Sequence, residues 1–132
     1  MTIIGKATTD QIDQTAARAN TIVSKLLNTA CEAKMVAWLE PLEDAAAKQQ
    51  AKTARAALFQ LLVAAADLGE LAGTADWDQE ALTQRIERIE ACVISALNVF
   101  ERECNLDRNE LGGAYFARRD YVPQAWQRPA AA

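Results

Sequence analysis

Three long stretches of the chain place small or apolar residues at alternating steps of four and three positions. The pattern covers 12–37, 47–72 and 82–100, and its main members are Ile, Val, Leu and Ala. Such spacing puts these side chains on one face of an α-helix that packs against neighbouring helices. Hydrophobic residues make up 51% of the chain, and the many alanines among them favour helix over sheet. The sequence therefore predicts an all-α protein.

Proline and glycine residues divide this pattern. Pro41 follows the first stretch, and proline cannot continue a helix through the preceding turn but fits the first turn of a new one. The segment around it is either a tight turn between antiparallel helices or a kink in one long helix, and we favour the turn. Gly73 is expected to end the second helix in a left-handed conformation. Asp76 and Gln79 have the spacing of a capping box at the start of the third helix.

These boundaries predict helices over about 10–39, 41–72 and 77–105. Short connections between helices of similar length favour an elongated antiparallel three-helix bundle of up-down-up order in residues 1–111. Residues 112–132 are expected to form an irregular, aromatic-rich C-terminal arm. The alanine-rich seams predict a thin core, to which a second copy or a partner protein would add a helix.

Charge is unevenly distributed along the chain. Residues 1–66 carry seven basic and six acidic side chains, residues 67–111 carry four and eleven, and residues 112–132 carry three and one, which gives +1, −7 and +2. An acidic body argues against nucleic acid as the main partner and against an anionic membrane surface, because both need a clustered positive field. The start lacks the apolar core of a signal peptide, and the longest apolar block, 61–66, is far shorter than a membrane span. We therefore expect a cytoplasmic protein, or one inside a particle assembled there, with no membrane.

Sequence patterns of catalysis and of metal binding are scarce. The chain has no histidine, which removes the commonest general base and the usual metal ligand. Cys31, Cys92 and Cys104 form no CxxC pair, so we expect reduced thiols rather than zinc ligands. The sequence has no phosphate-binding loop, no GxSxG and no dinucleotide fingerprint. We predict a non-enzymatic protein with no cofactor and no metal site.

Paired carboxylates are the remaining candidates for chemistry. Glu87 and Glu90 lie three residues apart on the third predicted helix, and Asp107 and Glu110 have the same spacing. Together with Glu101, the first pair would form a candidate metal or acid–base site. We instead interpret these carboxylates as a solvated helix face on which arginines alternate with them as partners. The arginines of that face are Arg85, Arg88 and Arg102.

The C-terminal segment holds four of the eight aromatic residues of the chain. Its prolines exclude a regular helix across its second half. Its rings argue against simple disorder, because disordered segments are usually poor in aromatic residues. Trp, Tyr and Arg are the residues most enriched at binding hot spots. The predicted partner-binding residues are Tyr115, Phe116, Arg118, Arg119, Tyr121, Trp126 and Arg128.

Three interpretations of this arm remain open. It folds back along its own bundle, it docks onto a neighbouring copy or another protein, or its rings and arginines stack on nucleic acid. The arm's charge of +2 beside the −7 of residues 67–111 fits either of the first two. We favour docking onto a protein and regard nucleic acid as the weakest of the three.

The sequence therefore predicts a helical assembly or adaptor subunit that docks through its arm onto copies of itself or onto partner subunits. Subunits of virions, secretion machines and multi-subunit enzymes share this plan by analogy of architecture. The alternative is a small acidic inhibitor or immunity-type protein that occupies a basic cleft on a toxin or a nucleic-acid enzyme. The acidic residues of that alternative are Asp76, Asp78, Glu80, Glu87, Glu90, Glu101 and Glu103.

Overall fold

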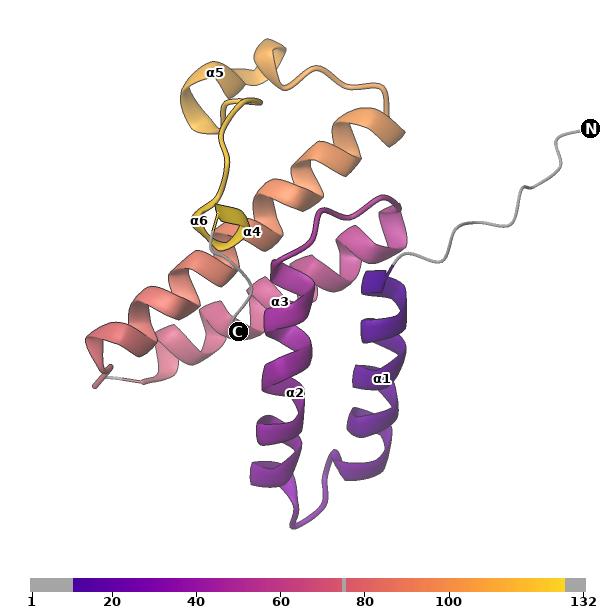
Figure 1. The fold of residues 1–132 in the computed structure, drawn as a ribbon, viewed down its shortest axis with the longest axis vertical. Helices are drawn as coiled ribbons and strands as arrows, with labels where there is room; N and C mark the ends of the chain where they lie inside the picture. Colours follow the sequence, from indigo (N-terminus) through magenta and orange to yellow (C-terminus); the bar gives the residue numbers. More distant parts are fainter. Residues whose placement is uncertain (1–10, 75, 128–132) are drawn as a thin grey trace, which may run out of the picture.

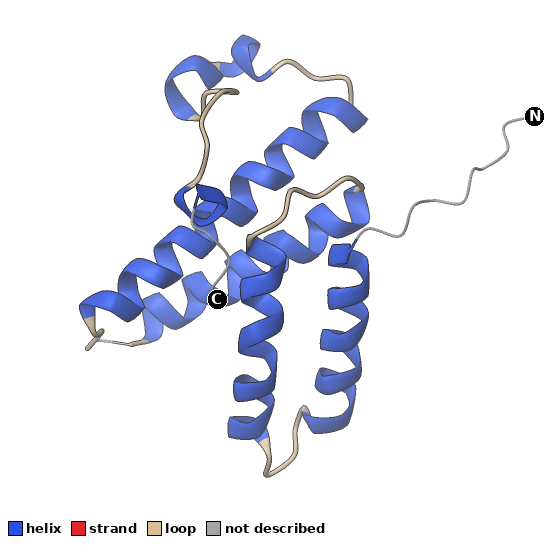
Figure 2. Ribbon diagram, in the orientation of Figure 1, coloured by secondary structure: helices blue, strands red, loops and turns tan. Residues whose placement is uncertain are grey.

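The computed structural model describes residues 11–74 and 76–127, and within them it is helical with no strand (Figure 2). The prediction of an all-α protein is confirmed for this part of the chain. The long helices are α1 (Gln11–Leu26), α2 (Glu32–Ala47), α3 (Ala54–Gly73) and α4 (Gln79–Glu103). Three short elements follow: the 3-10 helix η1 (Arg108–Leu111), α5 (Gly113–Phe116) and α6 (Gln124–Gln127).

Two crossing helix pairs take the place of the predicted three-helix rod. α1 and α2 form one hairpin, and α3 and α4 form a second antiparallel pair that crosses it (Figure 1). The predicted helix over 10–39 is wrong, because it consists of two antiparallel helices. The predicted boundary at Pro41 is also wrong, since the second turn of the chain lies at 48–53.

The first helix ends because its chain reverses at Asn28, whose φ of 64° is left-handed. Asparagine tolerates this conformation better than other residues with a side chain. Thr29 Oγ1 donates to Leu26 O at 2.6 Å and accepts from Cys31 N at 3.1 Å. These bonds satisfy a carbonyl at the end of α1 and an N–H just before α2. The apolar pattern runs through this turn in the sequence because Ala30 fits its spacing. In the structure Ala30 is exposed, so it does not belong to a buried helix face.

Pro41 lies inside α2 rather than at its start. An interior proline removes a hydrogen bond and costs a helix about 3 kcal/mol. Pro41 and Ala37, whose carbonyl loses the partner, are both exposed residues, so this break in the hydrogen bonding lies on the solvent side of the helix. The acidic residues on both sides of it, Glu40 and Asp44, bind Arg88 of α4. We infer that these contacts hold α2 together across the proline.

Side chains from the second helix pair fix the turn at 48–53. Gln60 is fully buried, and its Nε2 donates to Ala46 O at 3.0 Å and to Gln49 O at 2.8 Å. Ser95 Oγ accepts from Ala51 N at 2.7 Å. The turn therefore depends on buried polar groups of α3 and α4 that the sequence pattern did not reveal.

The ends of α3 and α4 differ from the predicted caps. Gly73 is the last residue of α3 but has no left-handed backbone, and Thr74 caps the helix in an extended conformation. Asp78, rather than Asp76, is the N-cap of α4 and accepts from Ala81 N at 3.2 Å. Gly112 is left-handed, with a φ of 81°, and it ends η1.

The core is built mainly from alanines, so the helices approach closely. Ala46, Ala56, Ala57 and Ala96 are buried together in one cluster. A second cluster contains Ala47, Val63, Ala64, Ala91 and Cys92.

The three cysteines differ in their surroundings. Cys92 is buried and its pKa is raised to about 12, mainly by desolvation, whereas Cys31 and Cys104 are exposed. Cys92 therefore stays a neutral thiol at physiological pH.

Among the described residues, α3 is the one helix whose length and composition would allow it to cross a membrane. An 18-residue window of this 20-residue helix has a mean hydropathy of 1.4, and 33% of that window is buried in the protein. This differs from the expectation that no segment reaches such length, because alanines and a glycine extend the apolar block on both sides. α3 also carries Gln60 and Asp67, whose buried side chains bind other helices.

Candidate docking surface on the C-terminal arm

The C-terminal arm, residues 112–127 as described, folds back onto α2 and α4 (Figure 1). Trp126 Nε1 donates to Ala47 O at 3.0 Å, and its ring packs against the second core cluster together with Ala125. Pro123 is buried beside them. These contacts anchor the end of the arm in the protein's own core.

Arg108 fixes the beginning of the arm. It is 9% exposed, and its Nε donates to Glu101 Oε1 at 2.6 Å while Nη1 donates to Ala117 O at 3.0 Å. Its Nη2 also binds the side-chain oxygen of Asn98. Gly113 packs on the same side chain so closely that an added Cβ would lie 2.5 Å from Arg108 Cγ and 2.6 Å from Arg108 O. The turn into the arm is therefore held by one arginine that spans α4, η1 and α5.

Arg119 ties the middle of the arm to α4. Its Nη2 lies 2.7 Å from Glu101 Oε2 and 2.7 Å from Asp107 Oδ1. The hydrogen bonds from Arg119, followed by those from Arg108, lower the pKa of Glu101 to about 2. The pKa of Asp107 is also lowered, first by the backbone N–H of Asn109 and then by Arg119. Glu101 therefore remains a carboxylate that binds two arginines at ordinary pH.

Between these anchors the arm presents aromatic rings to solvent. Tyr115 is 87% exposed and Phe116 is 77% exposed. Their ring centroids lie 5.1 Å apart with the planes at 84°, an edge-to-face pair. Large side chains are rarely left this exposed on a segment that is otherwise fixed, because water disfavours apolar surface.

A groove of about 550 Å³ lies between these rings and α4, and we call it the arm groove. Its α4 wall contains the apolar side chains of Ile89, Val93 and Ile94. Tyr121 closes one side, and Glu90 accepts a hydrogen bond from it that raises the pKa of Tyr121. The arm groove thus joins an apolar wall, two exposed rings and polar edge groups.

The structure divides the predicted partner-binding residues into two groups. Tyr115, Phe116, Arg118 and Tyr121 line the arm groove. Arg119 and Trp126 instead bind the protein's own α4 and α2. Arg128 lies outside the described residues.

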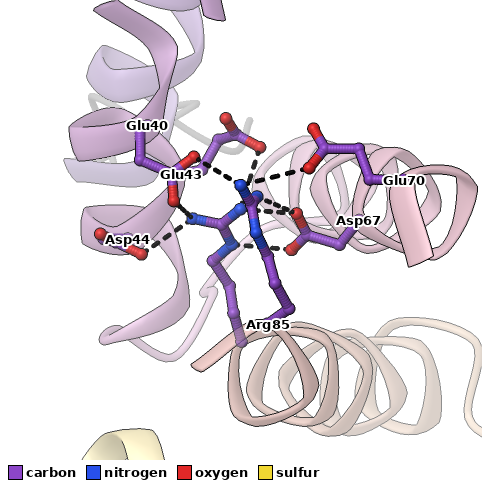
Figure 3. Close-up of polar contacts among 7 residues, drawn as sticks. Glu40, Glu43, Asp44, Asp67, Glu70 and Arg85 are labelled. Atoms are coloured by element: carbon purple, nitrogen blue, oxygen red, sulfur yellow. Dashed lines mark hydrogen bonds and ion pairs between the residues drawn. The ribbon is translucent and has the colours of Figure 1, made fainter. Parts of the chain in front are cut away.

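A second polar site, the charge cluster, joins α2, α3 and α4 (Figure 3). Arg88 of α4 is 2% exposed and Asp67 of α3 is fully buried, and Arg88 Nε donates to Asp67 Oδ2 at 2.7 Å. Arg88 Nη1 also lies 2.9 Å from Glu40 Oε1 and 2.9 Å from Asp44 Oδ1 of α2. The same arginine therefore holds three helices together.

Arg85 extends the charge cluster toward the surface. Its Nη1 lies 2.8 Å from Asp67 Oδ1, and its Nη2 lies 3.2 Å from Glu40 Oε2 and 3.2 Å from Glu70 Oε2. The interpretation of Arg85 and Arg88 as members of a solvated face is wrong, because both bind carboxylates of other helices. The one sequence signal for this cluster is Asp67, which directly follows the apolar run of 61–66.

The charge cluster holds more acids than bases. Its five carboxylates, those of Glu40, Glu43, Asp44, Asp67 and Glu70, face the two guanidinium groups of Arg85 and Arg88. Desolvation raises the pKa of Glu43 to about 7, although Arg88 Nη2 lies 3.6 Å from its Oε2. The contacts of these side chains with one another are those of an ion-pair network that joins three helices.

The acidic residues of the inhibitor alternative are partly occupied within the molecule. Glu101 binds Arg108 and Arg119, Glu90 binds Tyr121, and Asp78 caps α4. Glu103 lies 3.5 Å from Arg102. In the described ranges 11–74 and 76–127, no three His, Cys, Asp or Glu side chains are placed to hold a metal ion, the set of Glu87, Glu90 and Glu101 included.

Comparisons with known proteins add no relative: no protein-family model matches the chain, and neither curated proteins nor solved structures give a significant match.

Proposed function

We propose that this protein is a non-enzymatic assembly or adaptor subunit that docks through the arm groove and its rings onto protein partners. The partners are copies of the same chain or subunits of a larger complex such as a virion, a secretion machine or a multi-subunit enzyme. The observation that carries this proposal is the pair of exposed rings, Tyr115 and Phe116, on an arm anchored at both ends.

Anchoring matters because binding a flexible arm costs conformational entropy. A segment already held in its bound shape loses less freedom on association, so more of the contact energy appears as affinity. Trp126 and Arg108 supply this rigidity, while Tyr115 and Phe116 remain available for contact. Tyrosine and arginine are also among the residue types most enriched at binding hot spots.

The partner surface that fits is apolar with an acidic edge. Ile89, Val93 and the two rings offer apolar contact, and Arg118 at the rim is exposed, with Asp120 as its surface partner at 2.8 Å. A carboxylate of the partner would replace Asp120, which sits in water and forms a weak pair. This electrostatic part would set specificity and association rate more than affinity.

The test uses substitutions rather than truncation of the arm. Removing 112–132 would also remove Trp126 from the core, so loss of binding would not be separable from loss of folding. We would tag the full chain and compare it with Tyr115→Ser/Phe116→Ser, using Leu27→Ser/Val36→Ser as the matched control on the other hairpin. Co-purification from native host lysate, read by mass spectrometry, should recover proteins or untagged copies with the parent and control only. Equal recovery by the ring variant would contradict the proposal.

The inhibitor alternative stays a second proposal and predicts a different response. A basic partner held by exposed acids would dissociate steeply as salt rises, because such pairs are screened. The ring-dependent partner should lose little affinity under the same conditions. The internal contacts of Glu101, Glu90 and Asp78 favour the first proposal, since these acids already have partners.

A further inference from the structure

α3 exposes an apolar face that no described part of the chain covers. Leu58 is 55% exposed and Leu62 is 59% exposed, although they belong to the helix with the membrane-like hydropathy. Ala66 and Gly69 continue the same stripe at helical spacing and are also exposed. The opposite side of α3 is the one that packs on α4 and α2. Exposed apolar stripes of this kind mark contact surfaces more often than chance.

The stripe forms one wall of a groove of about 860 Å³ between α3 and α1, which we call the α3 groove. Phe59 and Val63 of α3 are also in its lining. The α1 side offers mostly small residues, among them Ala16, Ala17 and Asn20, and α2 adds Leu39 and Glu43 to the lining.

The stripe is asymmetric in size and in charge along its length. Its N-terminal half carries the large side chains of Leu58 and Leu62, and its C-terminal half carries Ala66 and Gly69. A Cβ placed on Gly69 would meet nothing within 4 Å. Arg55, 84% exposed with a distant pair to Asp13 at 3.8 Å, lies near the start of the helix. Glu70, whose side chain is 42% exposed and pairs with Arg85 at 3.2 Å, lies near its end.

We propose that the α3 groove binds α3 of a second copy, antiparallel to the first and related by a two-fold axis near Leu62. Leu58 precedes Leu62 by four residues and Ala66 follows it by four, so Leu58 would face Ala66 of the other copy on each side of the axis, and Leu62 would meet its own equivalent at the axis. Arg55 precedes Leu62 by seven residues and Glu70 follows it by eight, so the two would form an ion pair twice across the axis. An isologous interface repeats every such contact.

Other occupants explain these features less well. A parallel pair of α3 helices would place Leu58 on Leu58 and Ala66 on Ala66, and would oppose the like charges of the two Arg55 side chains. A lipid surface would contact the leucines, but it would not explain why the side chains become smaller along the stripe or why opposite charges lie at its two ends. The interface shares none of these residues with the arm groove, so it goes beyond the docking function proposed above and does not depend on it.

Sedimentation velocity of the full chain over a wide concentration range tests the proposal. The mass should rise from monomer to dimer with concentration, whereas Leu62→Glu, which opposes two carboxylates at the axis, should stay monomeric throughout. Leu106→Glu, an exposed leucine of the loop after α4, is the matched control and should dimerise like the parent. Circular dichroism should show the same helix content for all three, because each site is solvent-exposed.

A charge exchange tests the antiparallel register. Arg55→Glu should weaken dimerisation about tenfold or more, since it replaces two attractive pairs by two repulsive ones. Adding Glu70→Gln to Arg55→Glu should restore part of the loss, because it removes the repulsion between copies without placing a third cation beside Arg85, which keeps Asp67 and Glu40 as partners.

Three results would overturn the proposal. A parent chain that stays monomeric at every concentration would do so, as would a dimer that survives Leu62→Glu but is lost in Tyr115→Ser/Phe116→Ser. In the latter case the arm proposal stands and this one fails. Binding of the monomer to phosphatidylcholine vesicles that is abolished by Leu62→Glu would assign the face to a lipid surface instead.

Discussion

Asp67 and Arg88 form a buried two-point ion pair between α3 and α4. Arg88 Nε donates to one carboxylate oxygen of Asp67 at 2.7 Å, and its Nη2 binds the other. Both side chains are almost completely removed from water, and Arg88 also reaches Glu40 and Asp44 on α2. A buried pair of this kind adds little net stability over an apolar core, yet losing one partner is costly.

Arg88→Met should therefore lower the free energy of unfolding by about 3 to 5 kcal/mol, because Asp67 would stay buried with Arg85 as its remaining cation. Urea denaturation followed by circular dichroism measures this loss. Arg118→Met is the matched control: Arg118 forms its pair with Asp120 at the surface, and its removal should cost less than about 1 kcal/mol. A loss at Arg88 no larger than that at Arg118 would show that the charge cluster does not hold the helices.

The helical class was predictable because alanine content and the four-three spacing are local properties of the chain. The topology was not, since alanine is compatible with both a helix seam and a turn. The four-three pattern therefore continues through the left-handed Asn28, and Pro41 predicts a boundary at a place where the structure has the interior of a helix. Proline prefers the first turn of a helix, but Glu40 and Asp44 on either side of Pro41 bind Arg88, which is distant in sequence. These contacts override that preference.

The candidate site was predictable in part for a related reason. Composition identified the aromatic arm, but it does not separate a ring that enters the core from one that faces solvent. Trp126 anchors the arm, whereas Tyr115 and Phe116 are exposed, and the difference depends on where Ala47 lies in space. The buried role of Arg88 was missed because arginine on a helix is usually solvated.

Glu43 should make stability depend on pH near neutrality. Its pKa is raised from 4.5 to about 7, so in the folded protein it keeps a proton that the unfolded chain has lost. Stability should therefore fall as pH rises from about 4.5 to 7 and level off above that range. Glu43→Gln, which cannot ionise, should be more stable than the parent by about 2 kcal/mol above pH 7, with the difference vanishing near pH 4.

Urea titrations at a series of pH values would follow this difference. Glu103→Gln removes an exposed carboxylate that lies 3.5 Å from Arg102, and it is the control. Its stability should follow that of the parent at every pH. A Glu43→Gln variant whose stability tracks that of the parent at every pH would mean that Glu43 ionises normally in the fold.

Glu101 should produce the opposite dependence in acid. Its pKa is lowered from 4.5 to about 2 by bonds from Arg119 and Arg108, so its contribution is complete above 4.5 and is lost as pH falls toward 2. Acidification should therefore release the middle of the arm first, with a change in the protection of the 108–119 amides from hydrogen exchange. Glu101→Gln should show the same loss of protection already at pH 7, while Glu103→Gln should keep it. Full protection in Glu101→Gln would show that the arm keeps its place without the ion pairs of Glu101.

Two glycines should respond to alanine in opposite directions. A Cβ on Gly113 would lie 2.5 Å from Arg108 Cγ and 2.6 Å from Arg108 O, and backbone atoms at that distance must move. Gly113→Ala should therefore cost about 1 to 3 kcal/mol and loosen the turn into the arm. Gly69 lies within α3 and has open space around its Cα, so Gly69→Ala should stabilise the helix by about 0.5 to 1 kcal/mol. Thermal and urea denaturation at a concentration where both variants are monomeric would measure the pair. If Gly113→Ala is as stable as the parent, the close packing of Arg108 on the arm is not what fixes its conformation.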